Sequence, residues 1–337
     1  MWLQIWVDWK VKKIVVFGGG TGTSLILENL KNITSEITVV VSVSDDGKST
    51  GKLREEFNIP AVGDIRKVLS SLSDLPNEYN KFMEYRFDTS SYLNNHALGN
   101  LILTSFLNNG YSLKTATDYL SELLKVKHKV LPLSNDYLTL MEETVTGKII
   151  EGQTNINSSA EKCKKLFYKE DVHVLDEVLA SINEADLIIL SMGSLYTSLL
   201  PHLICSEVKE SIINSNAKVM YICNALTEPG ETDKFTVGKH IEEINKYLGS
   251  NVIDVVIANN KMISKDILKD NENTKKKDLV TIDYEKLEKL NIKLIEDELL
   301  DIVDNKLIYN SKKLAKLIEK YIKEWYICLL QLMLKMK

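Results

Sequence analysis

The chain has 337 residues, of which 44% are hydrophobic, and its 42 Lys and Arg against 47 Asp and Glu give a formal net charge of −5. This acidic balance argues against non-specific binding to nucleic acid or to an anionic membrane surface. The four cysteines show neither CxxC nor zinc-ligand spacing, and no apolar run approaches the ~18 residues of a membrane helix, so we expect a soluble cytoplasmic protein without membrane insertion.

A βαβ unit is predicted near the N-terminus. Residues 13–17 and 37–43 are short β-branched runs flanked by glycine and polar turns, which predicts buried parallel strands. Between them, residues 24–31 have the apolar spacing of a helix. The opening MWLQIWVDWK carries three tryptophans, and we interpret residues 1–10 as an N-terminal extension, with a short docking strand as the alternative.

The middle of the chain changes pattern twice. Helical spacing prevails from residue 64 to about 125, which predicts a helical insertion, and residues 129–151 predict a β-hairpin or meander. After these segments, predicted helices alternate with predicted strands: helices at 174–182, 199–214 and 235–248, and strands at 186–190, 218–223 and 252–258. This alternation predicts a three-layer Rossmann-like α/β fold with a parallel sheet, formed by a single domain over residues 11–337.

The C-terminal part is less regular. Residues 265–277 are polar and charged and predict a surface loop, followed by short strands at 279–282 and 292–295 and a closing helix from Ser311. The final EWYICLLQLMLKMK has an apolar face. Such a face is typical of a packed terminal helix or of a homodimer contact.

Four glycines lie within the GGGTGT stretch at residues 18–23, between the first predicted strand and helix. Glycine lets the backbone approach a ligand, and a helix N-terminus offers free N–H groups, so the expected ligand is a phosphate or diphosphate. The NAD fingerprint needs glycine where Thr23 stands, and a Walker A loop fails because Ser42 occupies its first glycine position. A third kind of nucleotide loop stays open, with ligand-binding candidates Gly19, Gly20, Thr21, Gly22 and Thr23.

A second polar stretch, SVSDDGKSTGKLREEF, follows the second predicted strand. Ligands of open α/β sheets bind beyond the carboxyl ends of the strands. Asp45 and Asp46 are therefore placed to accept hydrogen bonds from a sugar or base, or to hold a Mg²⁺ ion that bridges a diphosphate. A solvated Asp-Asp-Gly turn is the alternative, which the position opposite the glycine loop disfavours.

Two later strand ends carry polar loops as well. MGSLYTS, residues 192–198, supplies a glycine, hydroxyls and a new helix N-terminus, which predicts a second anion-binding turn, with simple N-capping as the alternative. Asn224 opens NALTEPGET, and its amide suits the edge of a base or ribose. The candidates from these two loops are Gly193, Ser194, Thr197, Ser198, Asn224, Thr227, Gly230 and Thr232, with Glu231 in the same turn.

The helical insertion adds a third set of candidates. His96 and Asn100 lie one helical turn apart and would face the acceptor side of the cleft, although a lone histidine is often structural. Asp64 and Arg66 precede a predicted helix and would orient a metal and a phosphate; an N-cap aspartate and a surface arginine are the alternatives.

Seven motifs in order carry a family resemblance: GGGTGTS, SDDGKSTGKLR, GDIR, YRF, HALGNL, MGSLYTSLLP and YICNALTEPGET. Together they resemble the YvcK-type gluconeogenesis factors, which are bacterial relatives of the CofD-type 2-phospho-L-lactate transferases. The resemblance is clear from residue 11 to residue 258. Lys48 departs from the family pattern, because it stands where a second glycine is usual.

The resemblance implies a UDP-sugar-binding regulatory factor, with UDP-GlcNAc as one such ligand, needed for gluconeogenic growth and for cell shape and envelope morphogenesis. The transferase relatives move a phospholactyl group from a guanosine diphosphate-linked donor onto a deazaflavin precursor with a divalent metal. A metal-dependent transferase is therefore the alternative. In that case Asp45 and Asp46 would be catalytic, and Asp45 and Asp64 would hold the Mg²⁺; NAD is not expected.

Overall fold

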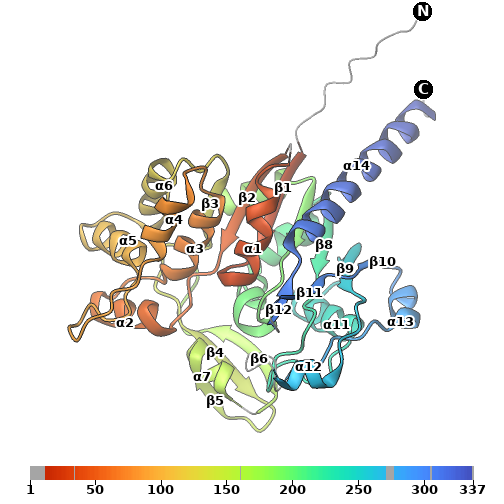
Figure 1. Cartoon of the computed structure of the whole chain (residues 1–337). Helices are drawn as coiled ribbons and strands as arrows, with labels where there is room; N and C mark the ends of the chain where they lie inside the picture. The colour runs from red at the N-terminus through yellow and green to blue at the C-terminus, as the bar shows by residue number, and fades with distance from the viewer. Residues whose placement is uncertain (1–11, 34, 160, 271–276, 304–305, 336–337) are drawn as a thin grey trace, which may run out of the picture.

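A seven-stranded parallel sheet lies at the centre of the fold, in the order β10-β9-β8-β7-β1-β2-β3 (Figure 1). The computed structural model describes residues 12–33, 35–159, 161–270, 277–303 and 306–335, so the predicted extension at 1–10 lies outside the described residues. The strands of this sheet are β1 (Lys12–Phe17), β2 (Ser35–Val41), β3 (Lys129–Pro132), β7 (Leu187–Leu190), β8 (Lys218–Ile222), β9 (Val255–Asn259) and β10 (Lys293–Asp297).

The sheet separates two hydrophobic cores. Alternate side chains of a strand point to opposite faces, so in β1 Ile14 and Val16 enter one core while Val15 and Phe17 enter the other, all at most 1% exposed. Because both faces are covered, the strands are continuous apolar runs, and this is why the sequence revealed them.

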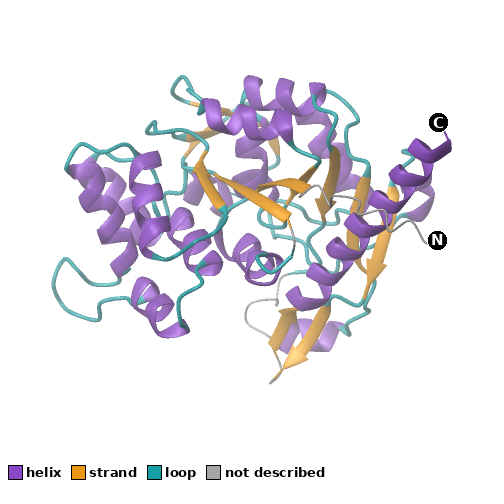
Figure 2. Ribbon diagram, turned by 90° about the horizontal axis from the view of Figure 1, so that it is seen from above, coloured by secondary structure: helices purple, strands orange, loops and turns teal. Residues whose placement is uncertain are grey.

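Helices lie on both sides of the sheet (Figure 2). Side chains of α1 (Gly20–Leu30), α3 (Gly63–Leu72) and α14 (Ser311–Lys335) fill one core. The other core is filled from α8 (Asp176–Glu184), α9 (Leu200–Leu203), α10 (Ser206–Asn214) and α11 (Val237–Leu248). The three-layer Rossmann-like prediction is confirmed.

The chain between β2 and β3 is helical, as Figure 1 shows at one end of the sheet. It contains α2 (Lys48–Phe57), α3, α4 (Asn77–Glu84), α5 (Leu98–Asn108) and α6 (Leu113–Leu123). Helices therefore begin at Lys48, earlier than the predicted boundary at residue 64. Arg54 anchors α2, because its guanidinium donates to the carbonyl oxygens of Ser44 (2.8 Å) and Leu138 (2.6 Å) and lies over the Tyr137 ring.

The predicted hairpin at 129–151 is only partly correct. The strands β4 (Leu140–Thr144) and β5 (Ile149–Glu151) do form an antiparallel pair, but in a separate small sheet with β6 (Cys163–Tyr168), which also carries α7 (Gln153–Ser158). Including β3 in the hairpin was wrong, because β3 pairs with β2 in the main sheet and buries Val130 and Leu131 on its two faces.

Several short elements also differ from the sequence prediction. The single helix predicted at 199–214 is two helices, α9 and α10, and a π-helical turn, η1 (Leu195–Leu199), precedes them. The strand predicted at 279–282 is wrong, since Leu279 and Thr281 form only isolated bridges. The helices α12 (Lys265–Asp270) and α13 (Tyr284–Lys289) and the hairpin of β11 (Leu300–Val303) and β12 (Lys306–Tyr309) were missed because such short segments carry little periodicity. None of the helices in the described part of the chain combines the length and apolar character that crossing a membrane requires.

The strand order reverses between β1 and β7. From β1 the chain builds β2 and β3 toward one edge, and then returns to place β7, β8, β9 and β10 toward the other. In open α/β sheets the crevice at such a reversal, outside the carboxyl ends of the strands, is the usual ligand site. The glycine turn follows β1 and the 192–198 turn follows β7, so both lie at this crevice.

Candidate functional site

The glycine turn begins α1 at the switch point. Gly20 has φ +67°, a left-handed conformation that side chains disfavour. At Gly22 a Cβ atom would lie 2.7 Å from the carbonyl oxygen of Met192, so only glycine lets the start of α1 approach the turn after β7 this closely. The first N–H groups of a helix lack intrahelical partners, so α1 presents anion-binding donors here.

The two threonines of the turn have different positions. Thr21 is exposed, whereas Thr23 is fully buried and its hydroxyl donates to Ser191 Oγ at 3.2 Å. The buried pair joins the turn after β1 to the end of β7. Ligand contact by Thr21 agrees with its exposure, while Thr23 acts as a link between the two strand ends.

Asp64 lies beside the glycine turn, with Lys67 and Asp45 close to it. A Cβ at Gly19 would be 2.7 Å from Asp64 Oδ2, and Lys67 Nζ donates to Asp64 Oδ1 at 3.0 Å. Burial, reinforced by the negative charge of Asp64, raises the pKa of Asp45 to about 6. Asp45 therefore lies in a partly dehydrated place, close enough to Asp64 for the two carboxylates to repel each other.

Asp46 belongs to a contact with the small sheet. Its Oδ1 accepts hydrogen bonds from the backbone N–H of Thr154 (2.8 Å) and from the Thr154 hydroxyl (2.6 Å), at the start of α7. Such a carboxylate satisfies a free N–H group of a helix N-terminus. The structure thus assigns Asp46 a linking role, and its contact with a ligand stays a prediction.

His96 and Asn100 lie together against α2. Ser49 Oγ is hydrogen-bonded to His96 Nδ1 (3.0 Å) and accepts from Asn100 Nδ2 (3.1 Å), and both side chains are buried. Burial lowers the pKa of His96, which favours the neutral ring. Of the two, Asn100 lines a cavity of about 230 Å³.

This 230 Å³ cavity joins the acidic loop to the helical insertion. Its wall includes Asp45, Lys48, Lys67, Arg86 and Asn100. Lys48 starts α2 with φ +47°, so a lysine holds a strained left-handed position at the cavity wall. Cations and carboxylates on one wall suit a ligand with phosphate groups, alone or with a metal.

The turn after β7 is held by a buried carboxylate. Glu231 Oε1 accepts from Ser194 Oγ (2.5 Å) and from the backbone N–H of Tyr196 (3.1 Å), and Thr197 Oγ1 donates to Asn157 Oδ1 at 3.0 Å. Burial raises the pKa of Glu231 to about 7. Glu231 therefore occupies part of the N-terminal end of η1, where the sequence predicted a ligand anion.

The loop after β8 is also bonded to its neighbours. Asn224 accepts from the N–H of Gly193 (3.1 Å) and donates to the Gly193 carbonyl oxygen (2.6 Å), which ties the ends of β7 and β8 together. Thr227 Oγ1 accepts from the N–H of Asp278, and Thr232 Oγ1 from that of Glu228. Gly230 turns the loop at φ +83°. Ser198, in the turn after β7, is half-buried. Its Cβ lies 3.3 Å from the position that a Cβ on Gly193 would occupy.

Comparison with known proteins agrees with this architecture. The 2-phospho-L-lactate transferase CofD family matches residues 14–300. The chain belongs to this family.

Relatives within the CofD family are similar along almost their whole length. The chain is 37% identical over 313 residues to the gluconeogenesis factor of Bacillus subtilis, covering 93% of this chain and 98% of the relative. It is 40% identical over 321 residues to the putative gluconeogenesis factor of Thermotoga maritima, covering 93% and 100%. A solved structure of a Bacillus halodurans protein has a TM-score of 0.87 at 36% identity, covering 92% of this chain and 99% of that one. A second, described as a member of the upf0052 family, has a TM-score of 0.86 at 36% identity.

Sequence reasoning missed three residues of this candidate site. Lys67 bonds Asp64, Ser49 joins His96 to Asn100, and Ser191 receives the Thr23 hydroxyl. Lys67 lies three residues after Asp64, a helical spacing that could have found it. Nothing in the sequence indicates the other two contacts, because each joins segments that are far apart in the chain.

Among the described residues, no cluster of three or more His, Cys, Asp or Glu side chains is arranged to hold a metal ion. Mg²⁺ does not need such a cluster, since it commonly takes one or two carboxylates together with waters and substrate phosphates. The neighbouring carboxylates of Asp45 and Asp64 fit that donor set, and a cation there would offset their mutual repulsion.

Proposed function

We propose that this protein binds a nucleoside diphosphate sugar, most specifically a UDP-sugar such as UDP-GlcNAc, as a cytoplasmic regulatory factor for gluconeogenic growth and cell-envelope morphogenesis. The observation that carries the proposal is the pair of turns at the switch point. The start of α1 and the turn after β7 are in contact through Gly22 and Met192. A diphosphate lying over this contact would accept from the free N–H groups at the start of α1, because Glu231 and Asn224 already accept N–H groups of the turn after β7.

The charges around the turns support a diphosphate. Lys67 and Lys48 lie beside the 230 Å³ cavity that continues from the acidic loop. Asp45 and Asp64 would hold a Mg²⁺ ion there, and the ion would supply neutralisation of the diphosphate charge. Without the ion, the two carboxylates would repel the phosphates, so binding is expected to depend on Mg²⁺.

The details of the turn support a nucleotide sugar over NAD. In the NAD fingerprint the third glycine allows close packing of the helix against the strand. Here Thr23 fills that position and is committed to Ser191. The physiological part of the proposal rests on the relatives, which carry the name gluconeogenesis factor.

A second candidate function is a metal-dependent transferase acting on a nucleotide diphosphate donor. The description of the matching family favours it, together with the Asp45 and Asp64 pair beside the glycine turn. In this case Asp45 would act as a metal ligand or base. The hydrogen bonds from Thr154 reduce the availability of Asp46 for the same role.

Thermal unfolding with UDP-GlcNAc, UDP-glucose, GDP and NAD, each with and without Mg²⁺, tests the proposal. A ligand at 100 times its Kd adds about 2.7 kcal/mol to the free energy of unfolding. We expect both UDP-sugars to raise the Tm, with a larger effect when Mg²⁺ is present. Stabilisation by NAD alone would contradict the proposal, and Mg²⁺-dependent release of nucleotide from a donor would favour the transferase.

A pair of glycine variants locates the site. Gly20→Ala introduces a side chain at φ +67° in the glycine turn, and Gly249→Ala does so at φ +73° after α11, at the opposite edge of the sheet with no atoms within 4 Å of the added Cβ. Both should lose about 1 kcal/mol of stability from backbone strain. Only Gly20→Ala should lose the Tm shift with UDP-GlcNAc; equal shifts in the two variants would place the ligand elsewhere.

A further inference from the structure

The helix α4 and the loop that follows it carry a group of exposed apolar side chains, most of them aromatic. Five large hydrophobic side chains between residues 79 and 93 are exposed: Tyr79 (53%), Phe82 (63%), Tyr85 (53%), Tyr92 (54%) and Leu93 (41%). No other stretch of this length exposes as many in the part of the chain that the structure describes. Single exposed apolar residues are normal, but a group of this kind marks an interaction site.

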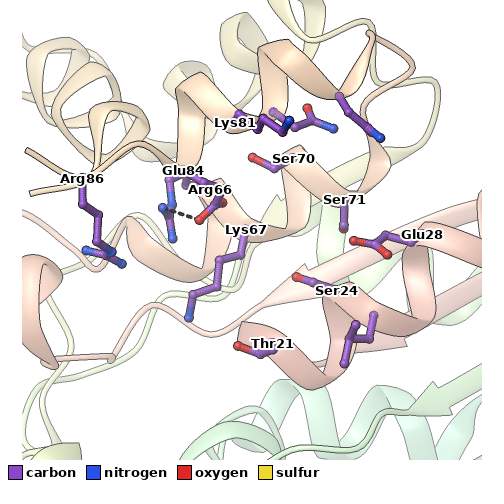
Figure 3. Close-up of a pocket in the computed structure, with 13 residues that line it drawn as sticks. Thr21, Ser24, Glu28, Arg66, Lys67, Ser70, Ser71, Lys81, Glu84 and Arg86 are labelled. Atoms are coloured by element: carbon purple, nitrogen blue, oxygen red, sulfur yellow. Dashed lines mark ion pairs between the residues drawn. The ribbon is translucent and has the colours of Figure 1, made fainter. Parts of the chain in front are cut away.

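The inner face of α4 is turned toward the rest of the protein. Glu84 forms an ion pair with Arg66 at 2.7 Å, at the wall of a cavity of about 460 Å³ between α1, α3 and α4 (Figure 3). Helical residues at i, i+4 and i+7 lie on one face. Glu78, Phe82 and the C-cap Tyr85 therefore share the opposite face, and all three are exposed.

The order of residues on this outer face is nearly symmetric about Phe82. In EYNKFMEYR, residues 78–86, Tyr79 and Tyr85 each lie three positions from Phe82, while Glu78 and Arg86 each lie four positions away. In an antiparallel pair of identical helices related by a two-fold axis, residue i of one copy faces residue j of the other, and j faces i. With the axis at Phe82, tyrosine faces tyrosine and glutamate faces arginine.

The charges at the two ends of this symmetric stretch are available to a second copy. Glu78 and Arg86 are exposed, and neither forms an ion pair within the described part of the chain. Arg86 donates to the carbonyl oxygen of Asn95 at 2.8 Å, which leaves its positive charge unbalanced. An antiparallel arrangement brings opposite charges together at both ends, whereas a parallel one would place like charges side by side.

We propose that α4 is the contact surface of a homodimer, in which a second copy of this chain packs its own α4 antiparallel across a two-fold axis at Phe82. The aromatic rings of the two copies then pack offset or edge to face. The partner's Glu78 lies beside Arg86, which also lines the 230 Å³ cavity, so each copy adds a carboxylate to the rim of the other's site. The proposal does not depend on which ligand that site binds.

Sedimentation velocity of the full chain over a range of concentrations tests the dimer. One short helix and a loop bury less than the ~800 Å² per partner of a standard interface, so we expect a weak dimer, with a Kd on the order of 10–100 μM. Phe82→Ser should weaken self-association about tenfold or more. Leu123→Ser, a matched change at a side chain that is 61% exposed at the end of α6, should leave it unchanged. Both variants should keep the Tm of the parent, because neither side chain is buried.

Exchanging the charges tests the antiparallel pairing. Glu78→Arg and Arg86→Glu each place like charges opposite one another and should each weaken the dimer about tenfold. The double variant restores opposite charges and should return the Kd to within about threefold of the parent. It also places each charge at the helix end that the helix dipole disfavours, so damage to α4 itself would be worse in the double variant, not repaired.

Three results would overturn the dimer. They are a monomer at every concentration, a dimer that Phe82→Ser leaves intact, and a double variant that associates no better than the single ones. The first would leave the exposed group to a different partner, and the second would place the dimer contact elsewhere. None of them bears on UDP-GlcNAc binding, which the Tm shifts measure separately.

Discussion

Several polar residues at the strand ends hold the loops in place through hydrogen bonds within the protein. Thr23, Asn224 and Glu231 each bond a neighbouring strand end, and two of them take backbone N–H groups that a ligand would otherwise use. A hydroxyl or amide suited to a ligand is equally suited to the protein backbone. Residue type alone therefore could not separate the two roles.

Glu231 gives a prediction for the pH dependence of stability. Its pKa is raised to about 7 by burial, so the folded state holds a proton that the unfolded chain loses at lower pH. This contribution is full below the unfolded pKa and is lost as the pH rises through about 7. Glu231→Gln keeps the acceptor oxygen for Ser194 and Tyr196 and should avoid the loss.

Urea unfolding of the parent and of Glu231→Gln from pH 4.5 to 8 measures this effect. We expect equal stability near pH 4.5 and an advantage of the variant on the order of 2 kcal/mol at pH 8. All other groups titrate alike in the two proteins. If the difference in free energy of unfolding between the two proteins does not change with pH, the raised pKa of Glu231 does not affect stability.

At the scale of elements, the acidic loop is fastened to two other parts of the chain. Arg54 bonds the Ser44 and Leu138 carbonyls, and Asp46 bonds the start of α7. The helix α2 and the small sheet thereby set the position of Asp45. The sequence predicted this loop as a ligand turn, but its anchors come from segments that only the fold brings near.

Asp46→Ala tests the contact between the acidic loop and the small sheet. Removing the carboxylate leaves the Thr154 N–H and hydroxyl without this acceptor, and loss of such a cap costs about 1 kcal/mol. We expect a Tm lower by a few degrees and faster amide exchange over residues 153–158. Asp46→Asn retains an acceptor oxygen and should behave more like the parent; unchanged exchange in Asp46→Ala would contradict the linking role.

At the scale of the molecule, one sheet carries both cores. Leu314 of α14 fills one core and Leu203 of α9 the other, and both are fully buried. Because every central strand contributes to both faces, loss of packing on either side should weaken the same cooperative unit. We therefore expect the chain to unfold cooperatively, as a single domain.

Leu314→Ala and Leu203→Ala test that cooperativity. Each should cost about 2–5 kcal/mol, the usual range for buried leucine. Differential scanning calorimetry should show one transition in both variants, shifted to lower temperature. Splitting into two transitions in either variant would mean that the two faces unfold separately.

The sequence by itself determined the parallel sheet, because strands buried on both faces are continuous apolar runs, and it located the glycine turn, because glycine is required where the backbone turns and where Met192 approaches Gly22. It did not reveal β3 as a sheet strand, since four residues have the same pattern in a hairpin. Only the tertiary structure decided which polar residues pair with each other. The Ser49, Thr154 and Ser191 contacts join segments distant in the chain, and local periodicity carries no information about such pairs.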